Sequence, residues 1–153
     1  RTVGDRRVAQ RSAWPGKVVP RVTAPSIIER SRSRKAGMIR LTALLRRNPE
    51  LSAEEFHTHW RDVHAAKILS VPRIREWLVR YEQHDRVPEA PGTWTGSEGF
   101  DGMTLQWYES LDDFTAMISD PDYQRIVGPD ERHLIDLANS VYLLTEEPRT
   151  ILG

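Results

Sequence analysis

One stretch, residues 51–65, constrains the fold more than any other part of the chain. Ser52 and Glu55 have the spacing of a capping box, in which each side chain bonds a free backbone N–H group at the start of a helix. We therefore expect a helix from about Ala53 to Ser70, because Pro72 then prevents its continuation.

This helix is expected to carry an apolar stripe with a histidine on each flank. At about 100° per residue, four side chains fall within about 60° of one another, namely Phe56, Trp60, Val63 and Lys67. His64 lies on one flank and His59 on the other. A half-buried His64 beside a cavity can accept or donate a proton near neutral pH. The structural alternative is that His64 bonds a neighbouring strand or Asp62 and closes the helix end.

The rest of the chain from Met38 onward alternates strand and helix patterns. Apolar and polar residues alternate with a period of two in four segments, which predicts strands at Met38–Arg47, Arg75–Val87, Met103–Tyr108 and Val141–Glu147. Glycine and proline make residues 89–99 a loop. Ser110 opens a second helical region, which Pro121 and Pro129 divide into shorter pieces. The order strand, helix, strand, strand, helix, strand predicts an α+β, ferredoxin-like βαββαβ fold with an antiparallel sheet.

Two helices can cover only one face of such a sheet. The other face would expose several apolar side chains, expected to be Trp77, Tyr81, Leu105, Trp107 and Val141 or Tyr142. A large apolar patch of this kind usually marks an interface. A homodimer that packs sheet on sheet is therefore expected.

Composition limits the remaining possibilities. The chain has 153 residues and no cysteine, so it forms no disulfide and no thiolate-based metal site. No apolar run approaches the roughly 20 residues needed to span a bilayer, so we expect a cytoplasmic protein without membrane contact.

Residues 1–37 differ from the rest, with ten Arg or Lys against two acidic residues. Their proline-rich, weakly apolar composition predicts a disordered basic extension. This segment has three possible interpretations. It is a transit peptide, a basic arm that binds nucleic acid or the acidic remainder of the protein, or an upstream extension before a natural start at Met38. Nucleic-acid binding is the least favoured partner class.

Several motifs in the right order resemble the EthD domain of the dimeric α+β barrel superfamily, over about residues 38–152. They are Glu55-Phe56 followed by Trp60-Arg61-Asp62-Val63-His64-Ala65, then Phe100-Asp101-Gly102, Trp107-Tyr108-Glu109-Ser110-Leu111-Asp112-Asp113-Phe114, Asp120-Pro121-Asp122-Tyr123 and Pro129-Asp130-Glu131. The resemblance implies a homodimeric barrel with a pocket for a small hydrophobic, aromatic or lactone-like molecule. It also implies cofactor-independent proton-transfer or oxidative chemistry, in catabolism or polyketide-type metabolism. A non-catalytic binding or accessory protein of the same fold is the alternative.

The chain departs from the family pattern at two places. Ala66 and Lys67 stand where members often have proline and an aliphatic residue, and Leu105 replaces an acidic residue common in the third strand. If that acid partners the histidine in relatives, its absence favours the non-catalytic alternative.

The candidate site combines these residues. His64 is the expected proton-transfer residue, and Tyr81 a catalytic hydroxyl donor. Trp60 and Trp107 are expected to contact the ligand, and Asp130 either does so or charges the first turn of a short helix. The alternative for Tyr81 and Trp107 is that both simply pack in the core of the dimer interface.

We expect no metal and no cofactor. His57 and His59 diverge on a helix, while His57 and His64 lie roughly 10 Å apart along its axis, too far for one ion. Haem ligation by a single histidine, as in other branches of the superfamily, is the alternative.

Overall fold

The computed structural model describes residues 37–87 and 99–153. The expected extension at residues 1–37, apart from its last residue, and nearly all of the expected loop at residues 89–99 lie outside the described residues.

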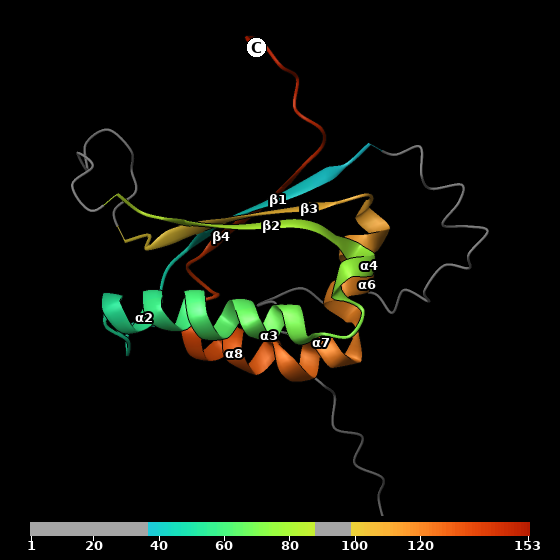
Figure 1. Cartoon of the computed structure of the whole chain (residues 1–153). Coiled ribbons are helices and arrows are strands. Elements are labelled where there is room, and N and C mark those ends of the chain that lie inside the picture. The colour runs from blue at the N-terminus through green and yellow to red at the C-terminus, as the bar shows by residue number, and fades with distance from the viewer. Residues whose placement is uncertain (1–36, 88–98) are drawn as a thin grey trace, which may run out of the picture.

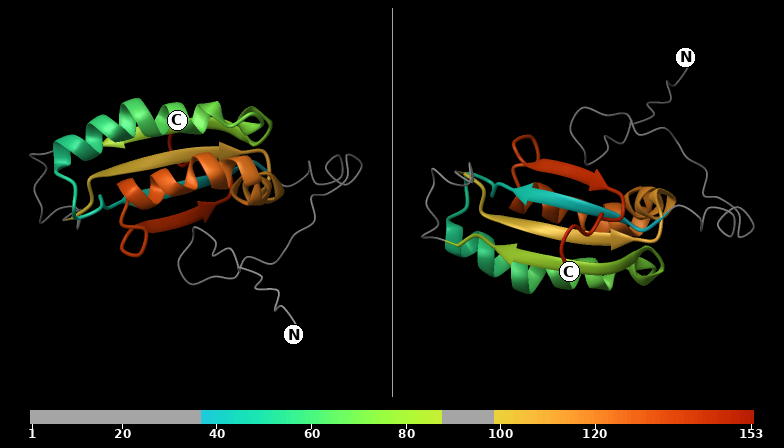
Figure 2. Two further views of the ribbon diagram at one scale, coloured as in Figure 1. Left: turned by 90° about the horizontal axis from the view of Figure 1, so that it is seen from below. Right: turned by 90° about the horizontal axis from the view of Figure 1, so that it is seen from above.

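The described residues form a four-stranded antiparallel sheet with helices on one face (Figure 1). The strand order is β2-β3-β1-β4, with β1 at Ile39–Leu45, β2 at Leu78–Asp85, β3 at Gly102–Tyr108 and β4 at Val141–Thr145. The second panel of Figure 2 looks onto the face without helices. The predicted α+β ferredoxin-like fold is confirmed. No helix in the described segments is long and apolar enough to cross a membrane.

The expected long helix is present and contains a π-helical turn. It consists of α2 (Ala53–His59), η1 (Trp60–His64) and α3 (Ala65–Ser70). The capping box forms as predicted, with Ser52 accepting from the Glu55 N–H and Glu55 accepting from the Ser52 N–H. Within η1, the Ala65 N–H donates to the Trp60 carbonyl five residues earlier. This wider turn brings residues five apart onto one side of the helix.

The π turn corrects the predicted apolar stripe. Phe56 and Trp60 are fully buried as expected, but Val63 is 38% exposed and His64 takes the buried position instead, at 4%. A regular 100° wheel places His59 and His64 on opposite flanks, whereas the π turn puts them on the same side. Lys67 leaves the stripe and bonds a carboxylate, and Ile68 is the buried residue of the next turn.

The remaining helices are α4 (Ile74–Trp77), α6 (Leu111–Ser119), α7 (Pro121–Ile126) and α8 (Gly128–Leu134). The second strand begins at Leu78 rather than Arg75, because Ile74 and Trp77 bury one face of a short helical turn. Trp77 therefore packs in the core and not on the sheet face. Pro121 and Pro129 start α7 and α8 as their positions predicted.

Side-chain alternation gives the sheet two different faces. In β1, Ile39, Leu41, Ala43 and Leu45 are all buried under the helices, while the residues between them face the other way. Gly102 is required where β3 passes the long helix, because a Cβ atom there would lie 2.6 Å from the Trp60 ring. The sheet therefore approaches the helix closely at the position where Trp60 is packed.

Candidate functional site

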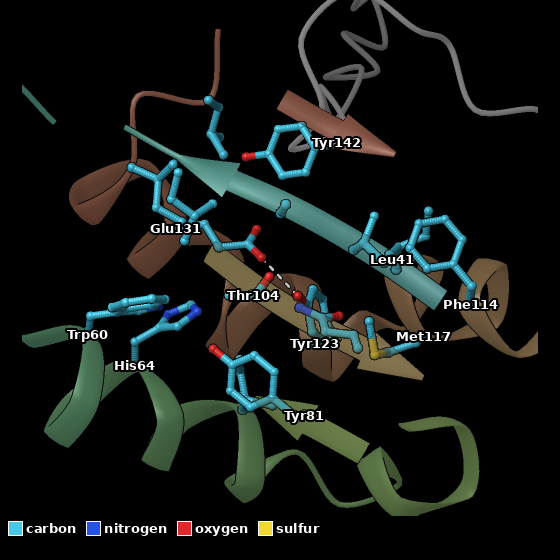
Figure 3. A pocket seen from close by; sticks show the side chains of 17 residues that line it. Leu41, Trp60, His64, Tyr81, Thr104, Phe114, Met117, Tyr123, Glu131 and Tyr142 are labelled. Atoms are coloured by element: carbon cyan, nitrogen blue, oxygen red, sulfur yellow. Dashed lines mark hydrogen bonds between the residues drawn. The ribbon is translucent and has the colours of Figure 1, made fainter. Parts of the chain in front are cut away.

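A pocket lies between the long helix, the covered face of the sheet and the helices α6–α8 (Figure 3). Its volume is about 40 Å³, room for about three water molecules. The walls are largely apolar, but they also present polar side chains from six different elements, namely His64, Tyr81, Thr104, Gln106, Tyr123, Glu131 and Tyr142. The pocket is thus a small cavity with several converging polar groups, the usual character of a ligand site.

Behind one wall, three side chains of the long helix meet one carboxylate of α8. Asp130 is only 3% exposed. Its Oδ2 atom lies 2.8 Å from Nδ1 of His64, and its Oδ1 atom lies 2.8 Å from Nε2 of His59. The Lys67 ammonium also donates to Oδ1. The π turn makes this cluster possible, because it sets both histidines on the side where α8 packs.

The cluster keeps Asp130 ionised. Burial alone would raise its pKa, but the hydrogen bonds from His64, Lys67 and His59 hold the pKa far below its usual range. An ionised carboxylate only accepts hydrogen bonds, so Nδ1 of His64 must be the donor. This assigns the tautomer of a neutral His64, with a proton on Nδ1 and a bare Nε2.

The other ring nitrogen of His64, Nε2, is on the pocket side. Figure 3 shows the ring directed into the cavity beside Trp60. Nε2 makes no hydrogen bond to any side chain in the described part of the chain. An imidazole whose other nitrogen is held by a carboxylate has the arrangement of a general base.

Tyr81 lies across the pocket and is oriented by Gln83. The Gln83 amide donates both to the Tyr81 hydroxyl and to the Trp60 carbonyl, each at 2.9 Å. Burial raises the pKa of Tyr81 to about 12, against hydrogen bonds from Gln83 and Trp60 that lower it. Tyr81 therefore stays protonated near neutral pH and acts as a hydrogen-bond donor rather than a base.

A second carboxyl group enters the pocket from α8. Glu131 accepts a 2.8 Å hydrogen bond from the Tyr123 hydroxyl, and Figure 3 shows this pair close to Thr104. Burial raises the pKa of Glu131, while the Tyr123 hydrogen bond and the charges of His64 and Arg132 lower it in part. The neighbouring residues Asp130 and Glu131 thus have pKa values shifted in opposite directions.

The predicted site residues fall into three places. His64, Tyr81 and Trp60 line the pocket together. Asp130 lies in the first helical turn of α8 as expected, but it contacts His64 instead of the cavity. Trp107 is on the open face of the sheet, where Arg80 stacks on its ring at 4.8 Å, and so it does not join the others.

Sequence reasoning gave no role to Glu131, Thr104 or Gln83. Glu131 follows Asp130 in a quoted family motif, and Thr104 is a polar residue between two apolar ones in a strand. Thr104 is 4% exposed and its hydroxyl has no hydrogen-bond partner among the described residues. A polar side chain at an inward strand position was the signal that would have found it. The described residues hold no group of three His, Cys, Asp or Glu side chains suited to a metal ion.

Comparisons with solved structures agree with this fold. A dimeric ferredoxin-like protein of unknown function from Bacteroides fragilis is 14% identical, with a TM-score of 0.55 over 72% of this chain and 97% of its own. An EthD family protein from Bacillus halodurans is 19% identical, with a TM-score of 0.54 over 72% of this chain and 99% of its own. The cofactor-independent oxygenase SnoaB from Streptomyces nogalater is 14% identical, with a TM-score of 0.52 over 77% of this chain and 100% of its own.

Comparison at the level of sequence identifies the family. No curated protein gives a significant match. The EthD domain, however, matches residues 48–138, which is more than half of the chain and includes the long helix, α8 and most of the residues that line the pocket. The chain therefore belongs to the EthD domain family.

Proposed function

We propose that this protein is a proton-transfer enzyme that needs no cofactor, acts on a small hydrophobic molecule of aromatic or lactone-like type, and uses His64 as its general base. One observation carries the proposal: the buried carboxylate of Asp130 holds Nδ1 of His64 at 2.8 Å and leaves Nε2 toward the pocket. A positioned imidazole of this kind typically contributes about 10²- to 10⁴-fold to a rate.

Each polar group near His64 has a definite part in this reaction. Nε2 removes a proton from the substrate, and the Asp130 carboxylate stabilises the imidazolium that results, as in other paired histidine bases. Tyr81 donates a hydrogen bond from its hydroxyl to an oxygen of the substrate. The Gln83 amide donates to the Tyr81 hydroxyl and holds it in place. Asp130 itself is a positioning residue, because His64 stands between it and the cavity.

The apolar part of the lining supports a hydrophobic substrate. Leu41, Phe114 and Met117 line the pocket on the side away from His64 (Figure 3). At about 40 Å³ the cavity is smaller than an aromatic ring system. A ring-sized substrate therefore requires the apolar end to widen, and flexible Met117 is the side chain best suited to move.

The comparison with SnoaB supports chemistry without a cofactor on this fold. SnoaB is itself a cofactor-independent oxygenase, and it shares the fold at 14% identity. SnoaB therefore supports one point only, which is that a protein of this fold can supply the reacting groups without a cofactor.

A homodimer is the proposed assembly. The open face of the sheet carries apolar side chains at several outward positions, among them Leu105, Trp107, Val141 and Leu143. Val141 is 50% exposed and Leu143 is 57% exposed, which is unusual for a strand that lies in a sheet. The related structure from Bacteroides fragilis is dimeric.

The alternative is a binding protein without catalysis. A purely apolar pocket would favour it, and so would a histidine without a carboxylate partner. Here Asp130 is the carboxylate partner of His64, and Tyr81, Thr104, Tyr123 and Glu131 line the same pocket. These groups favour the enzyme.

Proton exchange with solvent tests the base directly. We expect the protein to speed the exchange of deuterium from D₂O into acetylacetone or 2-tetralone, a small and a ring-sized carbon acid, followed by NMR. His64→Gln should lower the rate by about 10²- to 10⁴-fold. The matched control is His133→Gln, an exposed histidine outside the pocket. Equal exchange in the wild type and His64→Gln would overturn the proposal.

A further inference from the structure

Glu131 lines the pocket from α8. Its side chain accepts from Tyr123 through Oε1 and makes no salt bridge with any described residue. The surrounding wall is apolar, with Leu41, Ala43 and Ile135 among the lining residues. A carboxylate in such a place is costly unless it is neutralised. Its second oxygen is therefore free to carry a proton and to donate it to a ligand.

Thr104 supplies a second unused hydrogen-bonding group beside it. The hydroxyl is buried and unpartnered among the described residues, and it lies on β3 facing Glu131 in Figure 3. Buried polar groups in folded proteins are almost always satisfied, so an exception calls for a water or a ligand atom. Tyr123, Thr104 and Glu131 thus form a polar end of the pocket, separate from His64.

We propose that Glu131, as a neutral carboxylic acid, binds a carbonyl oxygen of the substrate together with Thr104, so that the site selects enolisable ketones. The inference rests on the proposed function of His64, since it names the class of substrate for that base. Two carboxyl groups kept in opposite protonation states are a recognised way for one site to supply both a base and an acid.

The reaction balances without any further reactant. His64 Nε2 takes the proton from the carbon next to the carbonyl group, and that C–H electron pair becomes the C=C bond. The π electrons of the carbonyl move onto its oxygen, where the Glu131 proton forms the O–H bond of the enol. Reversal of these steps with a deuteron from solvent returns the ketone carrying deuterium.

Compared with the titratable groups around it, Glu131 is the side chain best suited to donate a proton to the ligand. The titratable or charged groups that act on it come from every neighbouring element, namely His64, Tyr81, Tyr108, Tyr123, Asp130, Arg132 and Tyr142. Burial raises the pKa of each of the four tyrosines above its ordinary value, so they remain neutral. Arg132 is exposed, and Asp130 is already bound by three donors.

A binding comparison tests the oxygen contact. The probes are 2-tetralone and tetralin, which share a ring system but differ in the carbonyl oxygen, measured by NMR titration. We expect the wild type to bind the ketone about 3- to 10-fold more tightly, the size of one hydrogen bond. Glu131→Leu should lower this preference by the contribution of one hydrogen bond, about 3- to 10-fold. An unchanged preference in Glu131→Leu would overturn the proposal.

The pH dependence separates a proton donor from a merely structural carboxyl. Glu131→Gln keeps the acceptor for Tyr123 and keeps a donor, but it does not ionise. Ketone binding by the wild type should weaken as the pH rises through the pKa of Glu131, whereas binding by Glu131→Gln should stay constant. The same alkaline loss in both proteins would contradict the proposal.

The base and the acid fail in different ways. His64→Gln should lower the rate of deuterium exchange by about 10²- to 10⁴-fold and leave the preference for the ketone intact. If the wild type shows that preference without exchange, the proposed base fails and the oxygen-binding role of Glu131 stands. If exchange is present and depends on His64 but Glu131→Leu leaves the ketone preference intact, only the role of Glu131 is wrong.

Discussion

The two faces of the sheet differ in chemistry although the same strands build both. In β3, Thr104 and Gln106 point toward the helices and line the pocket, while Leu105 and Trp107 point the opposite way. Because side chains alternate along a strand, a single strand places polar groups in a site and apolar groups on a surface. The covered face is thus suited to chemistry and the open face to assembly, and variants on one face should leave the other unaffected.

The largest expected effect comes from the packing under the covered face. Phe56 is fully buried and its ring stacks on Trp60 at 5.3 Å. Phe56→Ala should lower the free energy of unfolding by about 3–5 kcal/mol, through the cavity that it leaves. Val63→Ala on the same helix is the control and should change it by less than about 0.5 kcal/mol. Equal losses in chemical denaturation would show that the π turn does not set which side of the helix is buried.

A charge on the open face should affect assembly instead. Leu105→Asp places an unpaired carboxylate in the proposed interface, so the dimer dissociation constant should rise at least about tenfold. Leu69→Asp, on the 57% exposed outer surface of α3, is the matched control and should leave it unchanged. Sedimentation velocity measures both. A Leu105→Asp protein that remains fully dimeric would place the interface elsewhere.

The smallest expected effect is the dependence of stability on pH at the pocket end of the covered face. Because the folded state raises the pKa of Glu131, its contribution to stability is present at low pH and is lost as the pH rises through that pKa. Asp130 behaves in the opposite way, since its lowered pKa gives stability that is lost in acid. With increasing pH, the unfolding free energy of the wild type should therefore fall relative to that of Glu131→Gln. A constant difference would show that folding does not raise the pKa of Glu131.

The sequence predicted the elements well because their signals are local. The capping box at Ser52, the alternation in β1 and the prolines at the start of α7 and α8 each depend on residues within a few positions of one another. His64 and Tyr81 were proposed from residue type and periodicity, and both line the pocket, although Tyr81 was expected on the open face of the sheet and lies on the covered one.

The missed features depend on contacts between distant segments. A regular helical wheel contains no π turn, and so it placed His59 and Lys67 away from the carboxylate that they bind. Asp130 is 66 positions from His64, and only the packing of α8 on η1 reveals that it is the carboxylate partner of this histidine. Trp107 was expected beside the ligand because the strand alternation gives two faces without saying which one the helices cover.

The protonation of His64 tests the central claim most directly and needs no substrate. Two-bond ¹H–¹⁵N correlation NMR reports which ring nitrogen carries the proton. We predict that neutral His64 has its proton on Nδ1 and a bare Nε2, because Asp130 accepts from Nδ1. Asp130→Asn should disturb this assignment, whereas the exposed His133 should be unaffected. A neutral His64 with its proton on Nε2 in the wild type would contradict the account, since no base would then face the pocket.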